Sequence, residues 1–565
     1  MRPNLIPLAA AVLTVAPTWS AGTVAQESQS PLPGVFGEVL DVRVVNLEVT
    51  VTDKNGIPIA GLKPEDFTLV VDGESVPIEY FSEVLGGVAV AEGAGSAPGL
   101  PGVPQVAPGG RVETSYLVFI DEFFSIAGDR NRVLDSLREQ LPLLGPEDRM
   151  AVVAYDGRDL SMLTSWSQSV DALERVFRRA RERPTAGLQR LSERRQAKLD
   201  ESVAVQSILS EAFASQGVRT GIDRTFLEPQ ERYYVQRLAE QLDRSVAAAA
   251  ATLRSFAKPP GRKVLLLLSG GWPYFPVEYL YSDFDRVILD REGLAGDDLY
   301  GRLIDTANLL GYTIYPVDVP GLDREAVDVS VFEPSADQGF NNRSFQRERE
   351  NHLTLERIAQ ETGGKALLNA RRIGALGEVV SDTRSYYWMG FSPDRAWNDE
   401  RHEVEIRTSN PDFRVRTRAG FLDSSRQREV SMAVESSLLF GNQPGASSLT
   451  VELGSARKAG RRRMEVPLTV LLPLTDLTFL PVGEGFASQV ELRIAVIDED
   501  GYRADIPVVA MTLQSAVEPD SRTVGRHQTS LVLRRKAHEA VVSVYDAASG
   551  RIFSTKVEIE EPRNL

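Results

Sequence analysis

The run KVLLLLSGG (263–271) is the clearest indication of fold class in this chain of 565 residues. An unbroken apolar run between a lysine and two glycines suits a β-strand with both faces buried, because a half-exposed strand would alternate apolar and polar side chains. Three similar runs, separated by amphipathic helical segments, are YLVFID (116–121), MAVVAYD (150–156) and YTIYPVDV (312–319). This alternation predicts an α/β domain over 113–383, with a doubly wound, Rossmann-like parallel sheet and a helical insertion at about 186–232.

Two shorter segments with strand-like alternation flank this domain, at 38–85 and 384–424. Tight-turn signals such as Asn55-Gly56 separate their strands. Each segment has too few strands for a stable sheet of its own. We therefore expect both to join in one β-sandwich, with the α/β domain inserted between them. The stretch 86–112 is rich in glycine and proline and is expected to be a linker.

The remaining segment, 430–565, is all-β by pattern, with short alternating runs and turns such as Ser549-Gly550. This spacing of strands and turns predicts a C-terminal immunoglobulin-like β-sandwich. Asp498 and Asp500 suggest calcium, but a hairpin turn explains them better, because the other ligands of a calcium loop are missing.

The N-terminus has the layout of a secretory signal peptide, with Arg2, an apolar stretch from Leu5 to about Val15, and small residues before Ala25. Residues 1–25 are therefore expected to be removed, and the mature protein to be periplasmic, extracellular or on the cell surface. No other segment is apolar and long enough to suggest a membrane span. The absence of cysteine from the sequence excludes disulfides and a thiol nucleophile.

The charge pattern argues against nucleic acid as a partner. The sequence holds 63 basic and 79 acidic residues, a formal net charge of −16, which repels polyanions at long range. Motifs of common hydrolases and nucleotide-binding loops do not occur, and the four histidines each stand alone in a helix or strand pattern. We therefore expect no catalytic residues and a protein that is not an enzyme.

The stretches VFIDEFFSI (118–126), VLLLLSGGW (264–272) and YTIYPVDV together resemble a von Willebrand factor type A domain. The flanks VTVTDKNGIPIAGLKPEDFTLVVDG (49–73) and SYYWMGFSPD (385–394) look like the VWFA-related acidobacterial domain family of exported bacterial proteins. The resemblance covers about 39–422. It implies a von Willebrand A-type domain inserted in a β-sandwich, with its ligand site at the carboxyl ends of the parallel strands.

The resemblance also implies a magnesium site. In such domains this site is made of the motif Asp-x-Ser-x-Ser, a threonine and a further aspartate. Asp121, Ser125 and Thr185 match three of these positions, whereas Phe123 and Ser269 replace a serine and the aspartate. Because magnesium requires about six oxygen ligands, we expect a degenerate site and no cofactor. Retained magnesium binding by the three matching residues is the alternative.

Aromatic residues occupy the same loops. Phe123, Phe124 and Ser269, with Trp272 and Tyr274 in the loop after the central strand, are expected to form an exposed rim that binds a partner. The function expected from the sequence is that of an exported, non-catalytic interaction or adhesion protein, whose protein partner the sequence does not identify. The alternatives are a cation-dependent adhesin with residual magnesium and, third, an envelope hydrolase.

Overall fold

The computed structural model separates the chain into two compact units, Val42–Asp423 and one that contains Ser424–Leu565, and each is considered by itself. The residues described are 44–90, 109–194, 196, 229–256, 259, 261–276, 296–320, 340–368, 374–393, 397–440, 449–483, 485–499, 502–504, 508–520 and 523–561. The predicted signal peptide and most of the predicted linker and helical insertion lie outside these residues.

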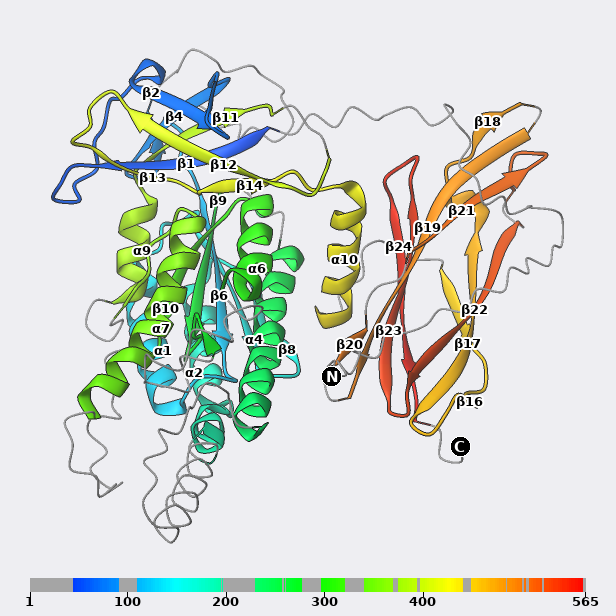
Figure 1. Ribbon diagram of the computed structural model, residues 1–565. Coiled ribbons are helices and arrows are strands. Elements are labelled where there is room, and N and C mark those ends of the chain that lie inside the picture. The colour runs from blue at the N-terminus through cyan, green and yellow to red at the C-terminus, as the bar shows by residue number, and fades with distance from the viewer. Residues whose placement is uncertain are drawn as a thin grey trace, which may run out of the picture. The chain divides into compact units, whose positions relative to one another are not determined.

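A five-stranded sheet in the order β10-β9-β6-β7-β8 forms the centre of the first unit (Figure 1). Its strands are β6 (Thr114–Asp121), β7 (Arg149–Tyr155), β8 (Leu160–Ser167), β9 (Arg262–Ser269) and β10 (Tyr312–Asp318). The first four in this order run parallel, and every residue of β6 is buried, as expected for a strand covered on both faces. β8 is an antiparallel edge strand, which the prediction of a wholly parallel sheet missed.

Helices flank both faces of this sheet (Figure 1). They are α1 (Ala127–Gln140), α2 (Val170–Glu182), α4 (Pro229–Ser255), α6 (Gly296–Leu310), α7 (Phe340–Glu361) and α9 (Ala375–Thr383), with the short 3-10 helix η2 (Leu141–Leu143) after α1. One core joins alternate β6 residues, such as Val118, to α1, α2 and α9. The other helices cover the opposite face, where α4 packs against β6 and β7, and α6 and α7 against β10.

The flanking segments pair with each other in two further sheets of this unit. The orders are β13-β1-β11-β4-β5 and β14-β12-β2-β3, so each sheet combines strands from before and from after the α/β region. The elements are β1 (Val45–Thr52), η1 (Pro64–Asp66), β2 (Phe67–Val71), β3 (Glu74–Val76), β4 (Tyr80–Leu85), β5 (Val88–Ala89), β11 (Tyr386–Phe391), β12 (Arg401–Thr408), β13 (Arg414–Arg416) and β14 (Gly420–Leu422). The two sheets share one apolar core, which includes Leu47, Leu69 and Met389. β5 and the buried Val112 show that the predicted linker 86–112 is partly ordered structure.

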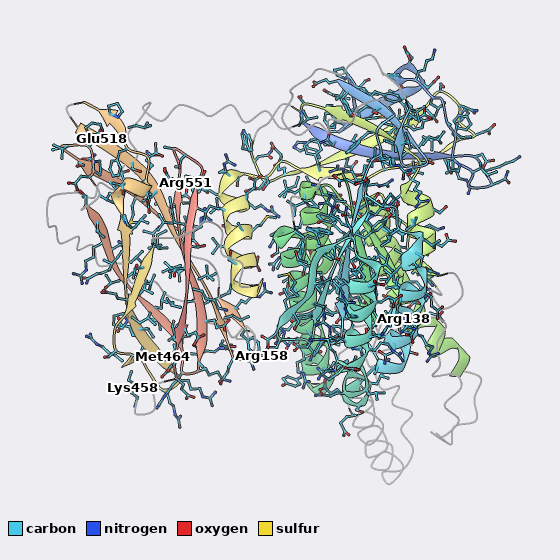
Figure 2. All side chains as sticks on the ribbon, turned by 180° about the vertical axis from the view of Figure 1, so that it is seen from behind. Arg138, Arg158, Lys458, Met464, Glu518 and Arg551 are labelled. Atoms are coloured by element: carbon cyan, nitrogen blue, oxygen red, sulfur yellow. The ribbon has the colours of Figure 1, made fainter. Side chains whose placement is uncertain are left out.

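Partly buried ion pairs join this two-sheet region to the α/β region. Glu48 on β1 forms an ion pair with Arg262, in which Oε2 lies 2.8 Å from Nε, and it accepts a hydrogen bond from the Thr313 hydroxyl at 3.1 Å. Arg416 on β13 donates to both oxygens of Asp382 on α9 at 2.6 Å. Since Arg262 begins β9 and Thr313 lies at the start of β10, the two sheets cover the amino ends of the parallel strands (Figure 1). The carboxyl ends and their loops are left at the other end, where Arg158 follows β7 (Figure 2).

The C-terminal unit begins with a helix, α10 (Arg426–Phe440), so the prediction of an all-β region from 430 is wrong at its start. Val434 on α10 packs against one sheet of this unit, in a cluster with the sheet residues Val541 and Tyr545. The strands are β15 (Thr450–Leu453), β16 (Arg457–Lys458), β17 (Arg463–Pro473), β18 (Leu480–Val482), β19 (Gly485–Asp498), β20 (Arg503–Ala504), β21 (Val508–Ser515), β22 (Val524–Arg534), β23 (His538–Asp546) and β24 (Ile552–Ile559), with η4 (Leu474–Asp476) after β17. They form two sheets that share one apolar core.

Candidate functional site

Three loops meet at the carboxyl ends of β6 and β9. Ala186 N, in the segment after α2, donates to Glu122 O at 3.0 Å, and Gly187 N donates to Ser125 O at 3.1 Å. The loop after β9 approaches the loop after β6 so closely that a Cβ on Gly270 would lie 2.3 Å from the Phe124 carbonyl oxygen. Only glycine fits such a contact without movement of backbone. The loops of Asp121, Thr185 and Ser269 therefore lie side by side.

Asp121 is fully buried beneath these loops and its carboxylate receives three N–H donors. Oδ1 accepts from the backbone N–H groups of Phe123 at 3.0 Å and Phe124 at 3.2 Å. Oδ2 accepts from Trp272 Nε1 at 2.7 Å. Burial raises the pKa of Asp121 to about 7, against the lowering effect of these three hydrogen bonds. The side chain thus links the first loop to the loop after β9.

This donor set does not fit a magnesium ion. Both oxygens of Asp121 face N–H groups, whose positive ends repel a cation. Phe123 supplies no ligand atom, and the Ser269 hydroxyl accepts from Gly271 N at 3.3 Å. Ser125 is buried with its hydroxyl unpartnered within the described part, and Thr185 is half-buried. Within that part, no group of three or more acidic, histidine or cysteine side chains could hold a metal ion.

Glu122, the next residue, forms a buried ion cluster that the sequence did not reveal. Both of its carboxylate oxygens accept from Arg183 Nε at 2.9 Å, and Oε1 also accepts from Arg130 Nη1 at 3.2 Å. Arg130 Nη2 donates to the carbonyl oxygens of Arg181 and Arg183. Burial raises the pKa of Glu122, although both arginines act to lower it. The cluster ties α1 and the end of α2 to the first loop.

The predicted aromatic rim needs correction. Trp272 is 0% exposed and stacks on Tyr300, with ring centroids 5.8 Å apart, and Phe124 is 8% exposed. Ser269 is also buried, so the placement of these three residues on an exposed rim is wrong. Their apolar groups pack under the loops, where burial is more favourable than contact with water.

Phe123 and Tyr274 are the two predicted rim residues that keep partial exposure. The Phe123 ring lies against Gly157, and the Arg190 guanidinium lies 4.6 Å from the ring centroid. Tyr274 Oη donates to Asp297 Oδ1 at 2.9 Å. Leu188, which the sequence did not single out, is 65% exposed on the segment that carries Arg190.

Two histidines that are isolated in the sequence pattern have acidic partners in the fold. His352 Nε2 on α7 lies 3.3 Å from Asp318 Oδ2 at the end of β10, and His402 Nδ1 lies 2.6 Å from Asp72 Oδ2. Hydrogen bonding and charge from Asp318 raise the pKa of His352, although burial acts in the opposite direction. Both pairs hold elements together, since each joins residues that are far apart in sequence.

Trp272→Phe is expected to destabilise the first unit by about 1.5–3 kcal/mol at pH 8, because it removes a hydrogen bond to a charged, buried carboxylate. The phenyl ring is smaller than the indole, so some apolar contact is lost as well, and the control below accounts for this part. Urea unfolding followed by circular dichroism measures this change. Trp388→Phe, on β11, is the matched control for ring size, and an equal loss in both variants would contradict the role of the indole N–H.

Comparisons with known proteins give weak structural similarity. No family model matches the chain, and no curated protein matches it. The X-ray structure of Northeast Structural Genomics Consortium target SoR45 is 16% identical and covers 21% of this chain and 93% of that chain, with a TM-score of 0.15. The vWF domain of the type V pili tip protein Mfa5 from Porphyromonas gingivalis is 13% identical and covers 48% of this chain and 94% of that chain, with a TM-score of 0.20.

A structure of three N-terminal domains of the same Mfa5 protein is 11% identical and covers 89% of this chain and 78% of that chain, with a TM-score of 0.19. The structural neighbours thus include the vWF domain of a pilus tip protein, at low overall similarity. Among the helices described, none combines the length and the apolar character needed to cross a membrane.

Proposed function

We propose that this chain is an exported, non-catalytic protein that binds a partner protein through the loops at the carboxyl ends of its α/β sheet. We assign the α/β region as a von Willebrand factor type A domain of the VWFA-related kind, and the C-terminal unit as an immunoglobulin-like sandwich. The observation that carries the proposal is the bond between Trp272 Nε1 and Asp121 at 2.7 Å, which joins two of the loops without a cation. Loops that are already fixed lose little entropy when a partner binds.

The contact surface that we propose, here the loop face, comprises Phe123, Leu188 and Arg190. Aromatic rings and guanidinium groups are enriched at the centre of protein interfaces, and the exposed leucine adds apolar area beside them. Arg190 Nη2 is paired with Glu193 Oε1 at 2.7 Å, so its orientation is fixed. Beneath the loop face, Glu122 and its two arginines hold the segment in place.

Capture of a partner from the envelope fraction of the native cell tests this assignment. The double variant Phe123→Ser/Leu188→Ser is expected to lose the captured protein by about tenfold or more, because both apolar contacts are removed. Leu85→Ser, an exposed leucine on β4, is the matched control and should capture as the wild type does. Full capture by the double variant, or loss of capture when EDTA is added, would contradict a cation-free loop face.

One observation favours the cation-dependent adhesin as a second candidate. The Ser125 hydroxyl is buried without a partner in the described residues, and Thr185 lies on the segment bonded to the same loop. A cation at this position would require Asp121 to release the Trp272 N–H. Direct titration with magnesium separates the two candidates.

A further inference from the structure

A cleft of about 710 Å³ opens in the first unit where β12 and the strand that follows it separate. Its floor is the second half of α7, including Gln360, and its walls are β12 and the segment 415–419. None of the loop-face residues lines it. The cleft is therefore a site distinct from the loops of the proposed function.

The cleft exists because a β-hairpin splits. β12 pairs with β14 as far as Glu403 opposite Gly420, and Val404 N then donates to Ala419 O at 2.9 Å. Beyond this point β12 continues along β2 in the four-stranded sheet, whereas β13 joins β1 in the five-stranded sheet. The two strands diverge and leave a wedge between their facing edges.

The β12 edge of this wedge presents unpaired main-chain groups. Asp72 N donates to Glu403 O at 3.1 Å, so Glu403 faces β2, whereas Val404 faces Ala419. Successive residues of a strand point their N–H and C=O groups to opposite sides. Ile406, two residues after Val404, therefore directs both groups away from β2 and into the wedge.

The β13 edge is arranged in the same way. Ile59 N donates to Val51 O at 2.9 Å, so the main chain of Val51 faces away from β13. Val51 lies opposite Val415, which makes this a pair without hydrogen bonds, and Val415 directs its N–H and C=O away from β1. In the described part of the chain, neither Ile406 nor Val415 has a main-chain partner outside its ladder.

Two residues that line the cleft also carry an unsatisfied side-chain atom. Arg416 Nη1 and Thr417 Oγ1 are buried and have no hydrogen-bond partner among the described residues, although both residues line the cleft. The other Arg416 nitrogen, Nη2, is occupied by Asp382. A free guanidinium N–H requires an acceptor such as a carbonyl oxygen, and a buried polar atom without one is costly.

We propose that this cleft binds an extended peptide segment of a partner protein, which adds as a strand between β12 and β13. The peptide main chain would supply the donors and acceptors that Ile406 and Val415 lack, and one of its carbonyl groups would accept from Arg416 Nη1. Glu405 is already held by Arg407, whose Nη2 lies 2.6 Å from its Oε2, whereas exposed Glu356 at the mouth favours a peptide with a basic residue.

Selection of a random dodecapeptide display library on the full chain, followed by anisotropy of the enriched peptides labelled with fluorescein, tests the proposal. Gln360→Trp fills the cleft from an exposed helical position, and Val415→Pro removes an N–H that the β1–β13 ladder does not use. Each variant is expected to weaken binding by about tenfold or more. Glu139→Trp, an exposed position on α1, is the matched control and should bind as the wild type does.

N-methylation of the peptide identifies main-chain pairing. Methylating either set of alternate amides should abolish binding, because a strand that lies between two others directs one set of N–H groups to β12 and the other set to β13. The proposal is overturned if no peptide is enriched on the wild type over Gln360→Trp, or if a peptide methylated on either set still binds as the unmethylated peptide does. Dimerisation in sedimentation experiments that Gln360→Trp abolishes would also overturn it, since a second copy would then occupy the cleft.

Discussion

Glu122→Gln is expected to lower the free energy of unfolding of the first unit by about 3–5 kcal/mol. The reason is that Arg130 is fully buried and would keep its charge after its acidic partner is neutralised. Arg183, which is only partly exposed, would also lose its bidentate partner. The raised pKa of Glu122 indicates that desolvation is already large in this cluster, so a single uncompensated charge is costly.

Urea unfolding followed by tryptophan fluorescence measures this effect in the full chain. Residues 424–565 contain no tryptophan, so the signal does not come from the C-terminal unit. Glu174→Gln is the matched control, because Glu174 forms an exposed pair with Arg178 one helical turn away, worth roughly 0.5 kcal/mol or less. A loss below about 1 kcal/mol for Glu122→Gln would show that the arginines find other partners.

The second expected result is that Asp121 makes the first unit less stable as pH rises. Burial raises the pKa of Asp121 from 3.8 to about 7 in the folded state. A raised pKa contributes stability that is fully present below the unfolded value and is lost as pH rises through the folded value. Between about pH 4 and pH 7 the contribution of Asp121 should therefore fall by roughly 1.4 kcal/mol per pH unit.

Comparison with Asp121→Asn isolates this contribution, because asparagine does not titrate. The unfolding free energies of the wild type and of Asp121→Asn are measured from pH 4 to pH 8. As pH rises, the wild type should lose stability relative to Asp121→Asn. A difference for Asp121→Asn that is flat, or that shifts towards the wild type, would mean that the three N–H donors outweigh burial.

The sequence predicted the central strands well because burial on both faces leaves a clear apolar run, as in Val264 to Leu268. It missed β8 because that edge strand is partly exposed and mixes polar and apolar residues. The start of the C-terminal unit was also misassigned, since α10 rests on a sheet through widely spaced side chains such as Val434. Weak periodicity of this kind does not distinguish a helix from strands.

The loop residues were harder to predict for a different reason. Nothing in the sequence tells whether Trp272 points outward to a partner or inward to Asp121, which lies 151 positions earlier. The ion pair between Glu122 and Arg183 spans 61 positions and has no local signal. Replacement of a metal ligand by Phe123 was visible in the sequence, but the indole N–H that contacts Asp121 was not.

The cation-free state of the loops is tested most directly by calorimetric titration of the full chain with magnesium chloride at pH 8, where Asp121 is largely ionised. We expect no saturable heat, and the same trace for the wild type and for Asp121→Ala. Saturable binding tighter than about 1 mM that disappears in Asp121→Ala would contradict it.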